Sequence, residues 1–422
     1  MRGRGIQSVA VIGGGPAGST LAALLARAGV RVVVFSRKRS SGLVVGESMI
    51  PAIIPILRTL GVEDDVRAYS TLKPGATFVV DREFTFQISF DEACRRIPRY
   101  AYNVPRERFD ATLRGACEAS GARILEMSAQ VEAVPGSESA RGDPRVRLGR
   151  EALEAASDCL GGAPDLVVDA SGRSRFLARL LDLPCYGQDR RDMALFAHCS
   201  GVAIDREGHV HSDRLEHGWC WRIPLPGRVS LGVVADPAVF RSLGASPEEQ
   251  YDAILRADPH LKRLTENAQR LTPVLRYGNY QLTTLRGVGD GWALVGDAFG
   301  FVDPVFSSGL FLAMDGARSL ARAIRAGTPA ALLRYERSHL AHIEAWRKAV
   351  SYFYDGRLLA LFRSRGEAQG RLFGRLLARY VSKHVGGVFT GESTVRPHSR
   401  RVLDFAIQHA LGDLDPEAFR IL

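Results

Sequence analysis

Three glycines near the start of the chain have the spacing of a phosphate-binding turn. The motif Gly13-x-Gly15-x-x-Gly18 separates a short apolar run, Val9–Ile12, from a stretch with helical periodicity. The first glycine permits a tight turn, the second lets a pyrophosphate approach the backbone, and the third allows close helix packing. The helix N-terminus also offers free N–H groups and a partial positive charge. These residues predict a strand, a turn and a helix that bind a dinucleotide.

The acid that usually follows the second strand of such a unit is missing. The strand is expected at Arg31–Phe35, and the next residues are Ser36 and Arg37. An acidic side chain at this point would bind the adenosine ribose. Here Ser36 offers one hydrogen bond, and Arg37 offers stacking or a phosphate contact, so we expect weaker binding of the ribose.

A second possible anion site lies further along the chain. Ser307, Ser308 and Gly309 put small residues and free N–H groups before a helical run that begins at Leu310. From the residue types alone, the segment that starts at Pro304 is equally a simple turn before that helix.

One lysine and two tryptophans are further candidates. Only five of the 56 basic residues are lysines, so an amine at Lys73 suggests a need that a guanidinium does not meet. An isolated lysine before a strand is also the ordinary pattern of a solvated side chain. Trp219 and Trp221 lie two residues apart, which places both rings on one face of a strand and is typical of sheet packing.

Several buried strands that end in short polar motifs surround these candidates. Leu166–Asp169 precedes an Ala-Ser-Gly turn, and Trp292–Val295 precedes Gly296-Asp297. Arg106 opens a helix that runs to about Ser120. Strands that end in this way at distant points of the chain predict one α/β domain around an extended cofactor, which suits FAD better than NAD.

The predicted fold is α/β, with a Rossmann-like FAD-binding domain, an antiparallel sheet on the substrate side and a C-terminal helical region. We assign residues 1–180 and 286–330 to the FAD-binding part, 181–285 to the antiparallel layer, and 331–422 to the helical region. The basic helical surface is either solvated or a docking surface for an acidic carrier protein.

Composition excludes several classes of protein. Hydrophobic residues make up 46% and charged residues 24% of 422 residues, as in a globular protein with a sizeable core. The net charge of +10 comes from arginines spread along the chain without a nucleic-acid-binding motif, so no nucleic-acid partner is expected. No apolar run is long enough to span a membrane, and we expect a cytoplasmic protein.

No metal site is expected. The six cysteines lack metal-ligand spacing, which favours free thiols in a reducing compartment. His339-x-x-His342 lacks a third ligand and is interpreted as part of a solvated helix face.

Spaced motifs over residues 6–330 resemble those of the flavin-dependent halogenases within the flavin monooxygenase group. Trp219-Cys-Trp221-Arg-Ile-Pro matches the family's WxWxIP signature, and Phe301-x-x-Pro304-x-x-Ser307-x-Gly309 matches FxxPxxSxG. Glu47-Ser48 lies where the family has its GES segment. Lys73 lies where the family has its active-site lysine.

The resemblance implies a chemistry for these residues. Reduced FAD (FADH2) reacts with O2 to a flavin hydroperoxide, and chloride or bromide attacks it to give hypohalous acid. The halide would bind near the N–H groups of Ser308 and Gly309, and Trp219 and Trp221 would keep substrate away from the flavin. Lys73 would hold the hypohalous acid by a hydrogen bond or as a haloamine. The implied cofactor contacts are Gly13, Gly15, Pro16, Ala17, Gly18, Ser36, Arg37, Glu47, Ser48, Arg106, Asp297, Pro304 and Gly309.

Phe306 departs from the tryptophan-type members of that family, which carry a glutamate in this segment. A phenylalanine cannot accept the ring proton as a general base does. The sequence resembles the phenol and pyrrole halogenases, whose substrates supply their own activation. We therefore expect electrophilic halogenation of a phenol or pyrrole, in secondary-metabolite or antibiotic biosynthesis.

The resemblance also implies partners. A separate flavin reductase would supply FADH2, and the aromatic substrate would be free or tethered to an acidic acyl or peptidyl carrier protein. Two alternatives remain: an aromatic hydroxylase or epoxidase that uses NAD(P)H, and a non-catalytic flavoprotein or carrier-binding scaffold. The Asp169-Ala-Ser-Gly172 segment, where self-reducing hydroxylases tend to have a DG motif, argues against the hydroxylase.

Overall fold

A parallel sheet carries the glycine turn. The computed structural model describes residues 5–37, 44–137, 142, 144–187, 190–278, 281–367, 383–411 and 414–421. Its six-stranded sheet has the order β19-β20-β10-β1-β2-β7. Its members are β1 (Ser8–Ile12), β2 (Arg31–Phe35), β7 (Arg123–Leu125), β10 (Leu166–Asp169), β19 (Val288–Gly289) and β20 (Trp292–Leu294). All neighbours pair in parallel except β19 with β20, so the carboxyl ends of β1, β10 and β20 meet at one edge.

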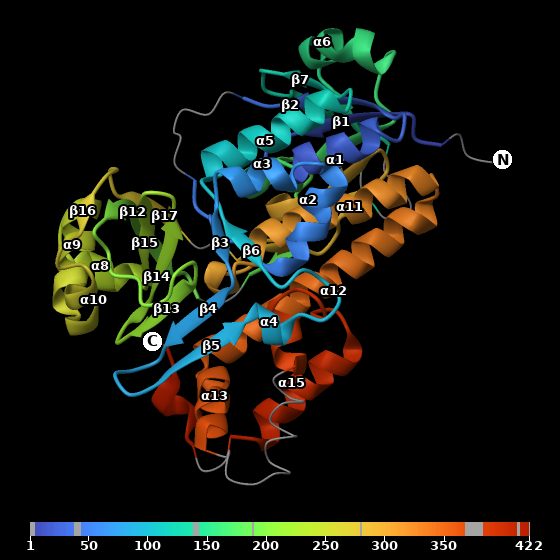
Figure 1. Ribbon diagram of the computed structural model, residues 1–422. Helices are drawn as coiled ribbons and strands as arrows, with labels where there is room; N and C mark the ends of the chain where they lie inside the picture. Colours follow the sequence, from blue (N-terminus) through green and yellow to red (C-terminus); the bar gives the residue numbers. More distant parts are fainter. Residues whose placement is uncertain are drawn as a thin grey trace.

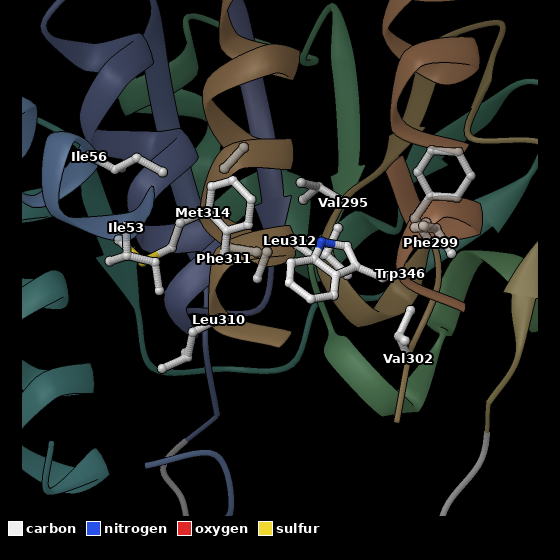
Figure 2. Packing of buried hydrophobic residues seen from close by; sticks show 14 of the residues in the cluster. Ile53, Ile56, Val295, Phe299, Val302, Leu310, Phe311, Leu312, Met314 and Trp346 are labelled. Carbon is white, nitrogen blue, oxygen red and sulfur yellow. The ribbon is translucent and has the colours of Figure 1, made fainter. Parts of the chain in front are cut away.

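Helices cover this sheet and bring distant segments to the same edge. Helix α1 (Pro16–Ala26) packs against α5 (Arg106–Ala119) and α11 (Gly309–Ala326), and α6 (Arg150–Leu160) packs against β2 (Figure 1). Between α11 and its neighbours lies the main core, in which Phe311 and Met314 approach Ile53, Ile56 and Trp346 (Figure 2).

A second, largely antiparallel sheet lies beside the first. Its order is β16-β12-β15-β14-β13-β4-β5, with β17 paired to β12. The strands are β4 (Gly75–Val79), β5 (Thr85–Ser89), β12 (Met193–Ser200), β13 (Val210–Leu215), β14 (Gly218–Leu225), β15 (Arg228–Ala235), β16 (Gln269–Arg270) and β17 (Leu275–Gly278). Helices α8 (Pro237–Leu243), α9 (Pro247–Ala257) and α10 (Pro259–Leu264) cover its outer face (Figure 1).

This sheet extends beyond the range 181–285 that the sequence suggested. Strand β4 pairs in parallel with β13, so β4 and β5 from the first hundred residues become part of the layer. The pairing joins segments more than 130 positions apart, which local periodicity does not reveal.

Helices form the C-terminal region, which completes the predicted α/β architecture. They are α12 (Pro329–Tyr354), α13 (Arg357–Glu367), α15 (Pro397–His409) and the short η5 (Pro416–Phe419). Residues 368–382 of the predicted helical region lie outside the described residues. None of the helices in the described part of the chain is long and apolar enough to cross a membrane.

The expected solvated histidine face on α12 is wrong. His339 and His342 are both buried, because this face of α12 lies against α11. The ring of His339 stacks on Tyr335, and a Cβ at Gly316 would lie 2.6 Å from it. Burial lowers the pKa of His339 to about 4, so the ring is neutral.

Shorter elements connect these layers. They are β3 (Thr71–Lys73), β6 (Ala101–Asn103), β8 (Val131–Ala133), β9 (Val146–Leu148), β11 (Cys185–Tyr186), β18 (Thr283–Thr284), η1 (Pro51–Ile53), α2 (Ile54–Leu60), α3 (Glu63–Ala68), α4 (Phe90–Ala93), η2 (Gly172–Ser174), α7 (Phe176–Leu180), η3 (Gly296–Ala298) and η4 (Pro304–Phe306). The β3–β6 pair is antiparallel and places Lys73 opposite Ala101.

Candidate active site

The glycine turn has the close contacts that its motif predicts. Gly13 has a φ of +109°, and a Cβ there would lie 2.4 Å from the carbonyl oxygen of Ala170. A Cβ at Gly18 would lie 1.9 Å from the carbonyl oxygen of Gly13. Gly15 is the N-cap of α1, and Pro16 is its first residue. The turn therefore presents bare backbone at the N-terminus of a helix, as a pyrophosphate requires.

A cavity of about 1280 Å³ extends from this turn to the second sheet. It exceeds the roughly 300–1,000 Å³ of ordinary small-molecule pockets, which fits a ligand as long as FAD. Every residue predicted to bind the cofactor lines it, with the single exception of Gly18. The predicted wall residues Trp219 and Trp221 also line it.

The predicted ribose end of the cavity contains a side chain that sequence reasoning missed. The Nη1 atom of Arg114 donates to Ser36 Oγ over 2.9 Å, and both residues line the cavity. Arg114 lies two turns after Arg106 on the same face of α5. The i, i+4, i+8 spacing of Arg106, Asp110 and Arg114 in the sequence could have indicated that Arg114 shares the helix face of Arg106.

Arg106 and Asp297 both line the cavity. Arg106 pairs with Asp110 over 3.0 Å and donates to the carbonyl oxygen of Val45 over 2.7 Å, so it holds the segment that leads to Glu47. Burial raises the pKa of Asp297 to about 6, and the guanidinium groups of Arg106 and Arg173 act in the opposite direction. Arg173, which lines the cavity, was also missed by sequence reasoning.

Lys73 is buried rather than solvated. Its side chain lines a small separate pocket of about 30 Å³, which has room for about one or two water-sized molecules. The Nζ atom donates to Ser48 Oγ over 2.8 Å and to the carbonyl oxygen of Met49 over 2.9 Å. Burial lowers the pKa of Lys73 to about 7, so a substantial fraction of the amine is neutral near neutral pH.

The Lys73 pocket and the large cavity share a thin partition. Val210 and Ser212 of β13, with Val305 and Ser307 of the turn before α11, line both spaces. Ser48 lines the large cavity while its hydroxyl accepts from Lys73. The partition therefore separates an FAD-sized space from a buried amine by a single layer of side chains.

Glu47 anchors the segment that crosses this partition. Its Oε1 lies 2.8 Å from His198 Nε2, and both side chains are buried. Val104 N donates to the carbonyl oxygen of Glu47 over 2.7 Å. The residues Glu47 and Ser48 thus connect the large cavity to Lys73 through fixed contacts.

The proposed halide segment starts an 18-residue helix. Ser308 is the N-cap of α11, and its buried Oγ has no hydrogen-bond partner within the described residues. Ser307 has a φ of +58°, a left-handed conformation that is costly outside glycine. Phe306 points to the lysine side of the turn, where it lines the Lys73 pocket and packs against Phe389.

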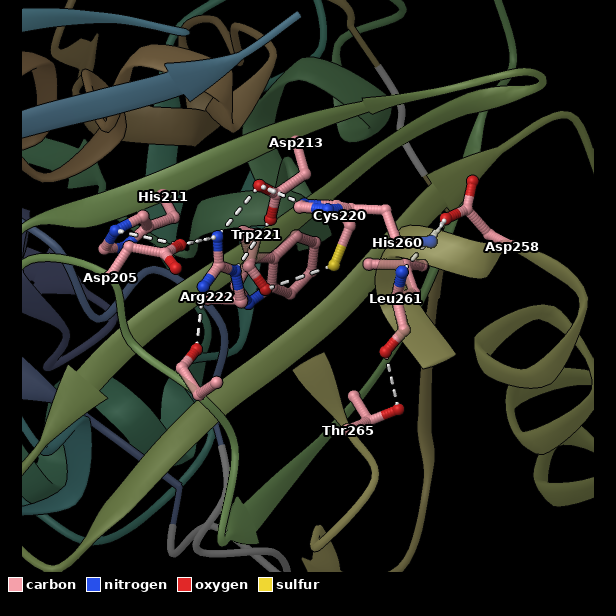
Figure 3. Close-up of polar contacts among 11 residues, drawn as sticks. Asp205, His211, Asp213, Cys220, Trp221, Arg222, Asp258, His260, Leu261 and Thr265 are labelled. Carbon is pink, nitrogen blue, oxygen red and sulfur yellow. Dashed lines mark hydrogen bonds and ion pairs between the residues drawn. The ribbon is translucent and has the colours of Figure 1, made fainter. Parts of the chain in front are cut away.

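The tryptophan strand is fixed from its other face. Trp219 and Trp221 lie on the cavity side of β14 with ring centroids 5.8 Å apart. On the opposite face, the fully buried Arg222 binds Asp213 through two hydrogen bonds of 2.8 and 2.9 Å, and it also donates to Asp205 (Figure 3). Burial acts to raise the pKa of Asp213, but hydrogen bonds from His260 and Arg222 outweigh it and lower the pKa. This network was not predicted from the sequence.

No group of three histidine, cysteine or acidic side chains in the described residues could hold a metal ion. The six cysteines are free thiols.

Two family models match the chain. The tryptophan halogenase model matches residues 82–358, and the FAD binding domain model matches residues 7–154.

The chain is similar in sequence to several halogenases over most of its length. A 1H-pyrrole-2-carbonyl-[peptidyl-carrier protein] chlorinase of Pseudomonas fluorescens is 28% identical over 84% of this chain and 84% of its own length. A tryptophan 2-halogenase of Chondromyces crocatus is 28% identical over 82% and 67%. The solved structure of a myxobacterial chondrochloren halogenase, an FAD-dependent enzyme, has a TM-score of 0.73 at 27% identity, over 83% of each chain.

The tryptophan halogenase model alone spans well over half of the chain, and it includes the tryptophan strand and the turn before α11. The glycine turn and the FAD-sized cavity agree with the second model. The chain belongs to the flavin-dependent halogenases, a family of FAD-dependent oxidoreductases.

Proposed function

We propose that this protein is a two-component, FADH2-dependent halogenase of electron-rich aromatics. A separate flavin reductase supplies FADH2, and chloride or bromide and O2 are the co-substrates. The product is a halogenated phenol or pyrrole of secondary metabolism, formed on a free substrate or on one tethered to a carrier protein.

The observation that carries the proposal is the buried amine of Lys73, which a layer of side chains separates from the large cavity. Lys73 is buried outside the large cavity, in a small pocket with room for a water-sized species. An oxidised halogen species must stay electrophilic until it meets the aromatic ring, and a dry pocket protects it. A nitrogen lone pair can accept halogen from such a species, whereas a guanidinium practically cannot.

Different residues of the chain serve different steps of the proposed reaction. Bound FADH2 supplies the two electrons that activate O2 for oxidation of the halide to hypohalous acid. The backbone at Ser308 and Gly309 holds the halide, and Trp219 and Trp221 close the cofactor side. At Lys73 the hypohalous acid is hydrogen-bonded, or it forms an N–halogen bond with release of water. Transfer from an N–halogen bond to the ring returns the ring proton to the nitrogen and restores the amine, whereas transfer from hydrogen-bonded hypohalous acid combines the ring proton with hydroxide as water.

The lysine pocket favours a substrate that activates itself. Its lining is largely apolar and aromatic, and none of its described residues is acidic. Phe306 packs with Phe78, Phe353 and Phe389 where a general base would otherwise stand. The OH of a phenol or the NH of a pyrrole donates electron density to the attacked ring and stabilises its positive charge, which a nearby carboxylate would otherwise stabilise. The named pyrrole relative acts on a carrier-bound substrate, which supports the tethered form.

We expect the enzyme to discriminate strongly against free tryptophan. In a competition assay with reductase, NADH, FAD and bromide, brominated phenol or pyrrole should form at least about 100-fold faster than bromotryptophan, because no carboxylate assists attack on the indole. Mass spectrometry of the mixed products measures the ratio. Comparable rates for tryptophan and the best phenol would contradict the assignment.

We also expect the oxidised holoprotein to lack its own route to reduction. Nothing in the sequence besides the FAD motif resembles a nicotinamide site, so NADH or NADPH alone should leave the flavin absorbance unchanged. Addition of a flavin reductase should bleach it within minutes. Rapid bleaching without the reductase would favour the self-reducing hydroxylase instead.

A further inference from the structure

A chain of buried hydrogen bonds links the tryptophan wall to the turn before α11. Tyr354 is the last residue of α12, and its hydroxyl accepts a hydrogen bond of 2.9 Å from Trp219 Nε1. The same hydroxyl donates to Asp303 Oδ2 over 3.0 Å. Asp303, Trp219 and Tyr354 are at most 6% exposed. Three segments that are distant in sequence therefore meet at one phenol.

Asp303 in turn determines the geometry of the proposed halide segment. Its Oδ1 accepts from Val305 N over 3.0 Å and caps the short helix η4. The chain then passes through the left-handed Ser307 into the first residues of α11. A strained residue persists only when its surroundings fix it, and the Asp303 cap is one such constraint.

The phenol of Tyr354 can be oriented in one way only. An indole N–H is a donor only, so the hydroxyl must accept a hydrogen bond from Trp219 and donate one to Asp303. Burial, followed by the charge of Asp303, raises the pKa of Tyr354 far above its ordinary value, so the phenol remains protonated. The guanidinium of Arg190 lies 4.2 Å from the ring centroid, and Ile421 N donates to the Tyr354 carbonyl oxygen over 3.0 Å.

We propose that Tyr354 is a positioning residue for halogenation, whose hydroxyl couples the placement of Trp219 to the turn that holds the halide. The inference rests on the proposed function. Without this hydroxyl, no hydrogen bond through Tyr354 links Trp219 to Asp303 and the turn before α11. The halide then binds less well, and less of the oxidised halogen species reaches Lys73.

The test compares two tyrosine hydroxyls on the same helix. Tyr354→Phe removes the coupling hydroxyl, and Tyr352→Phe removes a hydroxyl that donates to Asp404 over 3.0 Å on another face. Tyr354→Phe should raise the KM for bromide on the order of tenfold and lower the yield of product per FADH2 oxidised by a similar factor, since a buried hydrogen bond to a charged group is lost. The rate of FADH2 oxidation and the FAD content should match those of Tyr352→Phe, and both variants should remain folded at the assay temperature.

A fluorescence cycle tests the coupling without turnover. In the FAD-free protein, Tyr354→Phe should shift the tryptophan emission. The shift should vanish when both proteins also carry Trp219→Phe, because coupled residues are not additive.

The possible outcomes are distinguishable. If wild type makes no halogenated product, the proposed function fails and this inference fails with it. If wild type is active but Tyr354→Phe keeps its bromide KM and product yield, only the inference is wrong. A loss of FAD beyond that of Tyr352→Phe, unfolding of Tyr354→Phe at the assay temperature, or an emission shift that persists without Trp219 would likewise reduce Tyr354 to a structural role.

Discussion

Lys73→Met should abolish halogenation while the flavin half of the reaction continues. The substitution keeps much of the apolar stem and removes the amine, and the FAD-sized cavity lies on the other side of the partition. We expect FADH2 oxidation within about twofold of wild type and halogenated product at least about 100-fold lower, because the group that we propose to accept the halogen is gone. Oxygen consumption measures the oxidation of FADH2, and mass spectrometry of the same reactions measures the halogenated product.

Two further variants separate amine chemistry from charge. Lys73→Arg retains a cation but lacks an available lone pair, so it should be as inactive as Lys73→Met. Lys262→Met, which removes an exposed lysine on α10, should behave as wild type. A Lys73→Met protein that binds FAD and halogenates at near wild-type rate would show that the lysine is structural.

The same variant checks the buried state of the amine through stability. Between about pH 7 and the ordinary lysine pKa of 10.5, the unfolded chain binds a proton that folded Lys73 does not, so the wild-type free energy of unfolding rises with pH. Lys73→Met lacks this dependence. Its melting temperature relative to wild type should therefore be highest below pH 7 and should decline as the pH approaches 10.

Gly18→Ala should strongly weaken FAD binding. The added Cβ would lie 1.9 Å from the Gly13 carbonyl oxygen and 3.2 Å from the Ala170 Cβ, so the turn and α1 must separate. Overpacking of this kind costs about 1–3 kcal/mol. If the whole of a cost of about 3 kcal/mol falls on the FAD-bound form, the Kd for FAD rises about 100-fold. Titration of the FAD-free protein, followed by flavin fluorescence, measures the change.

A glycine in open space provides the control. Gly115 of α5 has nothing within 4 Å of an added Cβ, so Gly115→Ala should bind FAD as wild type does. Gly14→Ala should be intermediate, because its Cβ would meet the side chain of Ser36 at 2.7 Å, and a hydroxymethyl group can rotate away. Wild-type affinity in Gly18→Ala, with an unchanged circular dichroism spectrum, would contradict the assignment of this turn to the cofactor.

The glycine turn could be predicted from the sequence because its physics is local. Gly18 approaches the Gly13 carbonyl and Gly15 caps α1, and the motif spacing encodes this arrangement. The α/β architecture followed from apolar strands that end in polar turns. The boundary of the second sheet did not, because β4 joins β13 through a parallel pairing with no local signal.

The burial of individual polar side chains could not be predicted from residue types. Without the family resemblance, Lys73 has the pattern of a solvated lysine, and its pocket exists only because segments around Phe90, Val210, Phe306 and Phe389 converge on it. His339 and His342 were misjudged for the same reason, since the face that α12 buries depends on where α11 lies. The contacts of Tyr354 and Arg222 likewise depend on tertiary structure alone.

The most direct test of the proposed function is the mass spectrum of the product. Purified protein, a flavin reductase, NADH, FAD, O2 and bromide would be mixed with a panel of phenols and pyrroles, both free and as carrier-protein thioesters. We predict a new product with the paired isotope peaks of bromine that depends on both the reductase and Lys73. A product that instead gains oxygen and no halogen, formed equally well without bromide, would contradict the account.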